Sequence, residues 1–182
     1  GQALWRSETG GKLRVTVLTV TDTQGAWAGL GAEERGQSAA IARSRFEMSQ
    51  LQVAISATVI GEGGSGGALA LGVAGRVLMM ENAVYSGISV EGCAAILWKD
   101  AKSPEMREKA AAALRITAPE LLELKVIDEV LPEPKGGAHA DHEAAAKSLQ
   151  GGVNRHLEEI RKMRPEKLVR RRRQKFQRLG AR

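Results

Sequence analysis

Apolar residues along the chain alternate between short β-branched runs and longer stretches with helical spacing. The run Leu13–Thr21 has the composition of a buried strand. Two further strands are predicted at Val53–Ile60 and Arg76–Met80. Between the first two runs lies Ala32–Ser49, where apolar positions recur at helical spacing. Strand, helix and strand in this order predict parallel strands joined by crossover helices, and therefore an α/β fold.

The second half of the chain is predicted to be mostly helical, and several of its helices begin at capping residues. An extended piece is predicted over Ala83–Ser89, followed by a helix Val90–Trp98 that Ser89 caps. Two more helices are predicted to begin at Ser103-Pro104 and at Thr117, and a short strand to span Val126–Val130. A loop over 132–142 then precedes the two terminal helices, Glu143–Met163 and Glu166–Leu179. We expect a frayed or truncated N-terminus over residues 1–12, a main domain over residues 13–142 and basic C-terminal helices over residues 143–182.

Composition is that of an ordinary globular protein and excludes several classes. The 182 residues are 43% hydrophobic and 26% charged, which allows one domain with a real core. The single cysteine excludes a disulfide framework and a cysteine-rich metal site, and it fits a reducing compartment. No apolar run approaches the roughly 20 residues that span a bilayer, so no membrane span is expected.

The net charge of +6 is concentrated near the C-terminus. Arg161–Arg182 is densely basic and contains the four consecutive arginines Arg170–Arg173. Such a run is typical of a nucleic-acid-binding tail, of a solvated helix face, or of a surface that meets an acidic partner subunit. Aromatic residues make up only 3% of the chain, so a base-stacking platform is not expected and the second and third interpretations are favoured.

The most distinctive stretch is glycine-rich and runs from Thr58 to Ala70. A strand leads into five glycines in quick succession, and a short helix of small residues, Ala68–Val73, is predicted to follow. Glycine lets backbone N–H groups approach a ligand closely, and the unpaired N–H groups at a helix start favour negative charge. The stretch therefore predicts a cradle for an anion or a developing oxyanion, with a purely structural turn as the alternative.

Two chemistries for this stretch need no catalytic side chain. Gly61-x-Gly63-x-x-Gly66, with Glu81 further on, matches a dinucleotide-binding fingerprint, although the helix predicted after it is short for that role. An oxyanion hole built from backbone amides is the other, since preorganised donors are among the largest contributions to catalysis. The scarcity of other catalytic groups in the chain favours the oxyanion hole.

A nucleophilic serine is the third chemistry that fits. Gly63-x-Ser65-x-Gly67 matches the serine-elbow pattern, and Asp128 and His139 follow it in the order seen in hydrolases. His139 falls in a loop, and nothing in the sequence brings it near Ser65. The residues alone leave the three chemistries open.

Four segments carry long motifs that are far more specific than the glycine patterns. They are Gly31–Ser38 (GAEERGQS), Val59–Ala70 (VIGEGGSGGALA), Glu91–Lys99 (EGCAAILWK) and Pro132–His139 (PEPKGGAH). These segments closely resemble the carboxyltransferase α subunit of multi-subunit acetyl-CoA carboxylase. The resemblance runs from about Val20 to the end of the chain, where Arg173–Gly180 is similar to the family's ending and gives the basic tail a place in its last helix.

The resemblance implies a crotonase-like fold of repeated ββα units with a helical C-terminal extension. It implies an enzyme of fatty acid biosynthesis that transfers a carboxyl group from carboxybiotin, held on a carrier protein, to acetyl-CoA and gives malonyl-CoA. The implied cofactor is biotin, with no metal in this chain. The implied partners are a carboxyltransferase β subunit in an α2β2 assembly, the biotin carboxyl carrier protein and biotin carboxylase of this ATP-binding complex, and the implied location is the bacterial cytoplasm or the plastid stroma.

The resemblance also implies which residues form the site. Gly66 and Gly67 are implied to be the N–H pair that stabilises the oxyanion on biotin. Gly63 and Gly64 are implied to shape the turn and to be the next binding candidates. The remaining candidates, implied to line the same cleft, are the loop Gly25–Gly31 with Gly25 and Ala26 foremost, and Gly92 and Cys93 at a helix start.

The chain departs from the family pattern beside this cleft. Asp22–Gly29 reads DTQGAWAG where the family has two prolines, so this loop is expected to be less stiff. Val90 replaces another family proline, and Gly87 stands where the family prefers a β-branched residue. The family's α subunit also has a longer region ahead of its first strand. A catalytically impaired paralogue or a scaffold subunit that binds the β subunit is therefore the alternative function.

Overall fold

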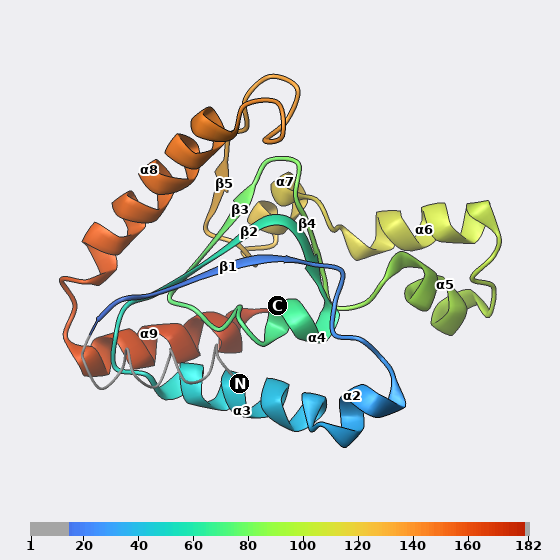
Figure 1. The fold of residues 1–182 in the computed structure, drawn as a ribbon, viewed down its shortest axis with the longest axis horizontal. Coiled ribbons are helices and arrows are strands. Elements are labelled where there is room, and N and C mark those ends of the chain that lie inside the picture. Colours follow the sequence, from blue (N-terminus) through green and yellow to red (C-terminus); the bar gives the residue numbers. More distant parts are fainter. Residues whose placement is uncertain (1–14, 181–182) are drawn as a thin grey trace.

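A five-stranded sheet organises the residues that the computed structural model describes, 15–180 (Figure 1). Its strands are β1 (Val17–Thr23), β2 (Ile55–Gly64), β3 (Arg76–Met80), β4 (Val84–Ser86) and β5 (Glu129–Leu131). The order is β1-β2-β3-β5, and β4 pairs with the end of β2 beyond β3. All of these strand pairings are parallel, which confirms the α/β prediction. The terminal stretch predicted over residues 1–12 lies outside the described residues.

Helices cover both faces of the sheet (Figure 1). α8 (His142–Ile160) crosses one face and contacts β2, β3 and β5, whereas α3 (Gln37–Gln50), α4 (Ser65–Leu69) and α9 (Pro165–Arg178) lie on the other. α5 (Val90–Trp98) and α6 (Pro104–Leu114) pack together as a projecting hairpin, and α2 (Leu30–Glu34) and α7 (Ala118–Glu123) are short. Because α8 shares the central core through Ala145, the division at residue 142 stays a prediction about sequence regions.

The core lies along β2 and β3, whose apolar side chains are buried on both faces. Ile55, Leu78 and Met79 are at most 1% exposed, and Met48 of α3 and Leu131 of β5 are fully buried beside them. Parallel strands covered by helices on both sides bury nearly every residue rather than alternate ones. This explains why the sequence shows continuous apolar runs at 53–60 and 76–80.

Several predicted boundaries are confirmed because their signals are local. β3 and α5 have the predicted limits, and Ser89 Oγ accepts a hydrogen bond from the Gly92 N–H at 3.0 Å. Thr117 and Glu120 form the predicted capping box of α7. Side-chain caps of this kind satisfy N–H groups that the helix cannot pair, so they fix where a helix starts.

Several predicted boundaries are wrong in the region that forms the candidate site, where β1 also ends at Thr23 instead of Thr21. The helix expected over Ala32–Ser49 is interrupted after α2, because Gly36 takes a left-handed conformation with φ 76° and α3 starts anew. The strand expected to end at Ile60 continues to Gly64, because its end pairs with β4 and Gly63 pairs with Thr23 of β1. α4 therefore starts at Ser65 instead of Ala68.

The interpretation of the basic C-terminal run as a solvated face is wrong for Arg172, which is 1% exposed. Its guanidinium donates to the carbonyl oxygens of Met48 at 2.7 Å, Leu51 at 2.9 Å and Val53 at 2.8 Å. These carbonyls belong to the end of α3 and to the segment that links α3 to β2. Arg172 therefore joins α9 to the α3–β2 connection. Burial lowers the pKa of Arg172 to about 10, and the group remains charged at neutral pH.

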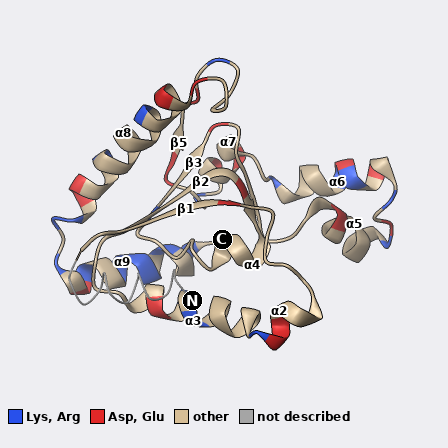
Figure 2. Ribbon diagram, in the orientation of Figure 1, with Lys and Arg blue, Asp and Glu red and all other residues tan. Residues whose placement is uncertain are grey.

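Two other cations of α9 also form ion pairs within the fold. Lys175 pairs with Asp128, and Arg171 donates to Glu159 of α8 at 3.3 Å. Figure 2 shows the basic residues along α9. Part of the charge that the sequence concentrates here therefore stabilises the packing of α9 against α8 and the start of β3.

Glu159 links α8 to both β3 and α9, and its protonation should weaken the fold. Its carboxylate accepts from Arg76 at 2.6 Å, and this hydrogen bond holds the pKa of the Glu159 carboxyl below its usual value of 4.5. A carboxyl whose pKa is lowered by folding adds stability above its unfolded pKa and loses it as the pH falls through the folded pKa. Because Glu159 is half exposed, we expect Glu159→Gln to lower the free energy of unfolding at neutral pH by at most about 1 kcal/mol.

Urea unfolding of the wild type and Glu159→Gln across an acid pH series checks this expectation. The difference between the two proteins should be constant above the unfolded pKa and should shrink once Glu159 is protonated. A difference that does not change with pH would contradict it.

Adjacent glycines in α8 provide a matched pair of stability predictions. A Cβ added at Gly152 would lie 2.3 Å from Leu131 Cδ2, whereas one added at Gly151 would meet only the end of the Arg155 side chain, at 3.5 Å. Gly152→Ala should therefore lower the free energy of unfolding by about 1–3 kcal/mol through overpacking. Gly151→Ala should raise it by up to about 1 kcal/mol, because alanine favours the helix. Chemical unfolding measures both, and equal effects would contradict the packing argument.

Candidate active site at the end of strand β2

The glycine-rich stretch forms the junction between β2 and α4. Gly63 and Gly64 are extended residues of β2, so the prediction that they shape the turn is wrong. The chain turns at Ser65, whose φ of 44° is left-handed. A residue with a Cβ pays about 1–2 kcal/mol in this region, so the surrounding structure must hold Ser65 there. We call Gly63, Gly64, Gly66 and Gly67 the glycine cradle.

The glycine cradle presents backbone N–H groups at the start of α4. Ser65, Gly66 and Gly67 are the first three residues of this helix, and helix geometry gives their N–H groups no acceptor within it. Gly64 occupies the N-cap position and supplies no side-chain cap. The N–H groups at a helix start carry partial positive charge, so they can donate to an oxygen that bears negative charge.

The loop after β1 packs directly on the glycine cradle. A Cβ added at Gly64 would lie 1.9 Å from the carbonyl oxygen of Gln24, and one at Gly67 would lie 3.1 Å from the carbonyl carbon of Gly25 and 3.2 Å from the Ala26 nitrogen. Gly25 has a φ of 138°, which favours glycine. Backbone meets backbone here, so Gly25 and Ala26 lie beside Gly64 and Gly67, as the resemblance implied.

A side-chain hydrogen bond helps to hold this loop in the absence of the family's prolines. Thr23 Oγ1 accepts from the Gly25 N–H at 3.2 Å. Asp22 Oδ1 accepts from the Glu62 N–H at 2.8 Å and ties the end of β1 to β2. The Thr23 bond restrains the loop itself, and the Asp22 bond restrains the ends of the two strands next to the cradle.

Tyr85 supports the cradle from β4, and no sequence motif singles it out. Its Cδ2 would lie 2.8 Å from a Cβ at Gly63, and its hydroxyl 3.0 Å from a Cβ at Gly72. Burial raises the pKa of Tyr85, and the charge of Arg45 opposes that shift, so the phenol stays neutral. Tyr85 pairs with Gly63 across the two strands, and an aromatic residue opposite a strand glycine is a recognised pattern. This pattern can be found only once the register of the two strands is known.

Gly92 and Cys93 lie in α5, and the described contacts do not join them to the glycine cradle. The Gly92 N–H already donates to Ser89 Oγ. Cys93 is 7% exposed and packs with Ala94 and Ala110 between α5 and α6. A role for these two residues in binding stays a prediction.

The geometry contradicts the serine-hydrolase alternative. Asp128 accepts from the Val77 N–H at 2.7 Å, at the start of β3, whereas Ser65 follows the end of β2. Since Val77 pairs with Ala57, and a strand rises ~3.3 Å per residue, roughly 25 Å separates Asp128 from Ser65. His139 is an exposed residue of the loop after β5.

The dinucleotide-binding alternative also lacks its structural context. α4 ends at Leu69, so no full-length crossover helix follows the glycines. Glu81, the candidate ribose ligand, accepts instead from the Glu133 N–H at 3.2 Å. Of the three chemistries, backbone amides are the one that the arrangement supports.

Residues 15–180 contain neither a candidate metal site nor a candidate membrane span. No group of three or more His, Cys, Asp and Glu side chains in this range is placed to hold a metal ion. None of the helices described there is long and apolar enough to cross a membrane.

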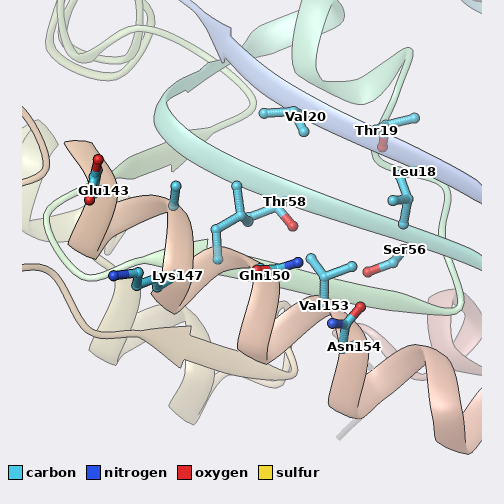
Figure 3. A pocket seen from close by; sticks show the side chains of 12 residues that line it. Leu18, Thr19, Val20, Ser56, Thr58, Glu143, Lys147, Gln150, Val153 and Asn154 are labelled. Atoms are coloured by element: carbon cyan, nitrogen blue, oxygen red, sulfur yellow. The ribbon is translucent and has the colours of Figure 1, made fainter.

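A cavity of 630 Å³ lies elsewhere, between α8 and the β1–β2 face (Figure 3). Leu18 and Val20 of β1 face Val153 of α8 across it, and the hydroxyls of Ser56 and Thr58 lie on the sheet side. None of the predicted site residues lines this cavity. The glycine cradle is therefore a separate site at the end of the sheet.

A family model described as acetyl co-enzyme A carboxylase carboxyltransferase-like matches residues 2–180. The acetyl-coenzyme A carboxylase carboxyl transferase subunit alpha of Gemmatimonas aurantiaca is 72% identical over 169 residues, covering 93% of this chain and 52% of that protein. The subunit of the same name from Geobacter metallireducens is 51% identical over 179 residues, covering 98% and 55%. The chain thus spans about half the length of the curated relatives it matches.

Solved structures with low sequence identity share the fold. A transcarboxylase 12S structure superposes with a TM-score of 0.71 at 18% identity, covering 90% of this chain and 31% of that one. A chain of a Pseudomonas malonate decarboxylase hetero-tetramer superposes with a TM-score of 0.74 at 15% identity, covering 93% and 68%. An enoyl-CoA hydratase/isomerase from Marinobacter aquaeolei reaches 0.55 at 14% identity, covering 100% of this chain and 73% of that one. The crotonase-like fold expected from the resemblance is confirmed.

Proposed function

Since the chain belongs to the acetyl co-enzyme A carboxylase carboxyltransferase-like family, we propose that it acts as the α subunit of a carboxyltransferase. The proposed reaction moves a carboxyl group from carboxybiotin on a carrier protein to acetyl-CoA and gives malonyl-CoA. The proposed partners are a β subunit, the biotin carboxyl carrier protein and biotin carboxylase. Residues 13–142 would hold the site and residues 143–182 would form its helical extension.

One observation carries the proposal: the uncapped N–H groups of Gly66 and Gly67 at the start of α4. Removing the carboxyl group leaves negative charge on an oxygen of the biotin ring, and donors fixed in advance lower the free energy of that charge. The chain needs no side-chain acid or base for this role. The positive end of the helix adds to the same effect, although α4 is short.

Apolar side chains lie next to Gly66 in the glycine cradle. A Cβ at Gly66 would meet only side-chain ends, Ile41 Cδ1 at 3.2 Å and Ala26 Cβ at 3.7 Å, so the approach to this amide is bordered by apolar groups. Apolar neighbours exclude water and strengthen hydrogen bonds to charge. Bound carboxybiotin would supply the carboxyl group, and Gly66 and Gly67 would hold the oxygen in position.

Co-purification with the matching β subunit, followed by a malonyl-CoA decarboxylation assay with free biotin, tests the proposal. A complex that turns over supports the carboxyltransferase. A complex without turnover supports the scaffold alternative, and the failure of any complex to form contradicts the proposed partner.

A further inference from the structure

Arg173, an exposed cation of α9, lines a hollow next to α3. Arg171, Arg172 and Lys175 are bound within the structure. Over residues 15–180, Arg173 and Arg45 of α3 make no ion pair with a carboxylate. Both are exposed, so their charges are available to a ligand.

The hollow between α3 and α9 has a volume of 470 Å³ and combines these two arginines with two phenylalanines. Phe46 is 64% exposed and Phe176 is 36% exposed, and both rings line the hollow. Among residues 15–180, no carboxylate lines the hollow. Its volume lies within the roughly 300–1,000 Å³ of small-molecule sites.

This pairing of groups selects a class of ligand. Exposed aromatic faces stack on planar rings, and arginine binds phosphate through two parallel N–H bonds. A bare phosphate would leave the rings unused, and an acyl chain would leave the arginines without a partner. We propose that this hollow binds a purine nucleotide, with the base against Phe46 and Phe176 and the phosphates on Arg45 and Arg173.

The proposed site is distinct from the glycine cradle, but α3 contributes residues next to both. Ile41, which borders Gly66, precedes Arg45 by one turn of α3, about 6 Å. Because the hollow lies this close to the glycine cradle, two sources of the nucleotide fit: a free nucleotide, or the 3′-phosphorylated ADP end of coenzyme A. Both sources offer adenine and a pyrophosphate, which is the chemistry that the hollow recognises.

Calorimetric titration of the full chain with ADP, adenosine and inorganic pyrophosphate tests the proposal. ADP should bind, and adenosine and pyrophosphate alone should bind at least about tenfold more weakly. Arg173→Gln should weaken both ADP and pyrophosphate, whereas Phe46→Ala should weaken ADP about tenfold and leave pyrophosphate unchanged, because a stacked base contributes roughly that factor. Both variants alter exposed side chains, so circular dichroism should show an intact fold.

Lys167→Gln is the matched control, because Lys167 is an exposed cation of α9 that lines neither this hollow nor its neighbour. It should leave ADP binding unchanged. An equal loss in Lys167→Gln and Arg173→Gln would overturn the proposal in favour of diffuse charge. The proposal would also be overturned if ADP did not bind at millimolar concentration. This holds as well if an oligonucleotide bound where ADP did not.

Comparing coenzyme A with 3′-dephospho-coenzyme A identifies the source of the nucleotide. Tighter binding of coenzyme A than of either ADP or the dephospho form assigns the hollow to the end of that cofactor. Equal binding of all three assigns it to free nucleotides. None of these titrations requires carboxyltransferase activity, so their outcome is separate from that of the proposed function.

Discussion

Replacing Arg172 with methionine is expected to lower the free energy of unfolding by about 3–5 kcal/mol. The methionine fills most of the space of the arginine stem but donates no hydrogen bond. Three carbonyl oxygens, of Met48, Leu51 and Val53, would lose their charged donor. Each buried acceptor left unpaired costs about 1–3 kcal/mol, and part of this is recovered where water reaches the corner. A loss of this size would leave a protein of ordinary stability marginal.

Urea unfolding measures this effect, and Arg171→Met is the matched control. Arg171 is the preceding residue of the same helix, but it is exposed and makes one ion pair with Glu159. Its replacement should cost less than about 1 kcal/mol. Arg172→Lys should fall between the two, since an ammonium cannot reach carbonyls in several directions as a guanidinium does. Equal losses in Arg171→Met and Arg172→Met would contradict the buried role.

The elements that the sequence predicted well depend on neighbouring residues. β3 shows as an apolar run, and Ser89 and Thr117 act on N–H groups within their own first turn. Such signals are complete within a few positions of the chain, so no tertiary information is needed to interpret them.

The features that the sequence missed depend on residues far apart. Arg172 bonds to Leu51, which lies 121 positions earlier, and within the sequence it resembles its three arginine neighbours. The extension of β2 to Gly64 depends on pairing with β4, and the role of Tyr85 depends on the register of that pairing. No local pattern encodes a register that forms only when the sheet assembles.

The candidate site falls between these two cases. Composition predicted the glycine cradle, and the resemblance chose among three chemistries. The approach of Gly25 to Gly64 follows from parallel strands, whose carboxyl ends meet at one edge of the sheet. The close contact of their backbones, which explains why both positions are glycine, required the structure.

Replacing Gly66 with valine is expected to reduce the turnover of the α–β complex at least about 100-fold in the malonyl-CoA decarboxylation assay. The branched side chain would occupy the space in front of the Gly66 amide, and removing one preorganised donor costs about that factor. The variant should still co-purify with the β subunit, because an added Cβ meets only side-chain ends of Ile41 and Ala26. Gly67→Val should impair folding as well, since its Cβ would meet the backbone of Gly25 and Ala26.

Ser65→Ala separates the oxyanion hole from a nucleophilic serine at the same junction. Alanine keeps the Cβ, so the strain of the left-handed φ is unchanged, and turnover should remain within a fewfold of the wild type. Ser65→Gly should relieve that strain and raise the free energy of unfolding by about 1 kcal/mol. If Ser65→Ala abolished turnover while Gly66→Val retained it, the hydroxyl would be the reacting group and the amides would serve only the fold. The opposite pattern assigns the chemistry to backbone N–H groups that no side chain can replace.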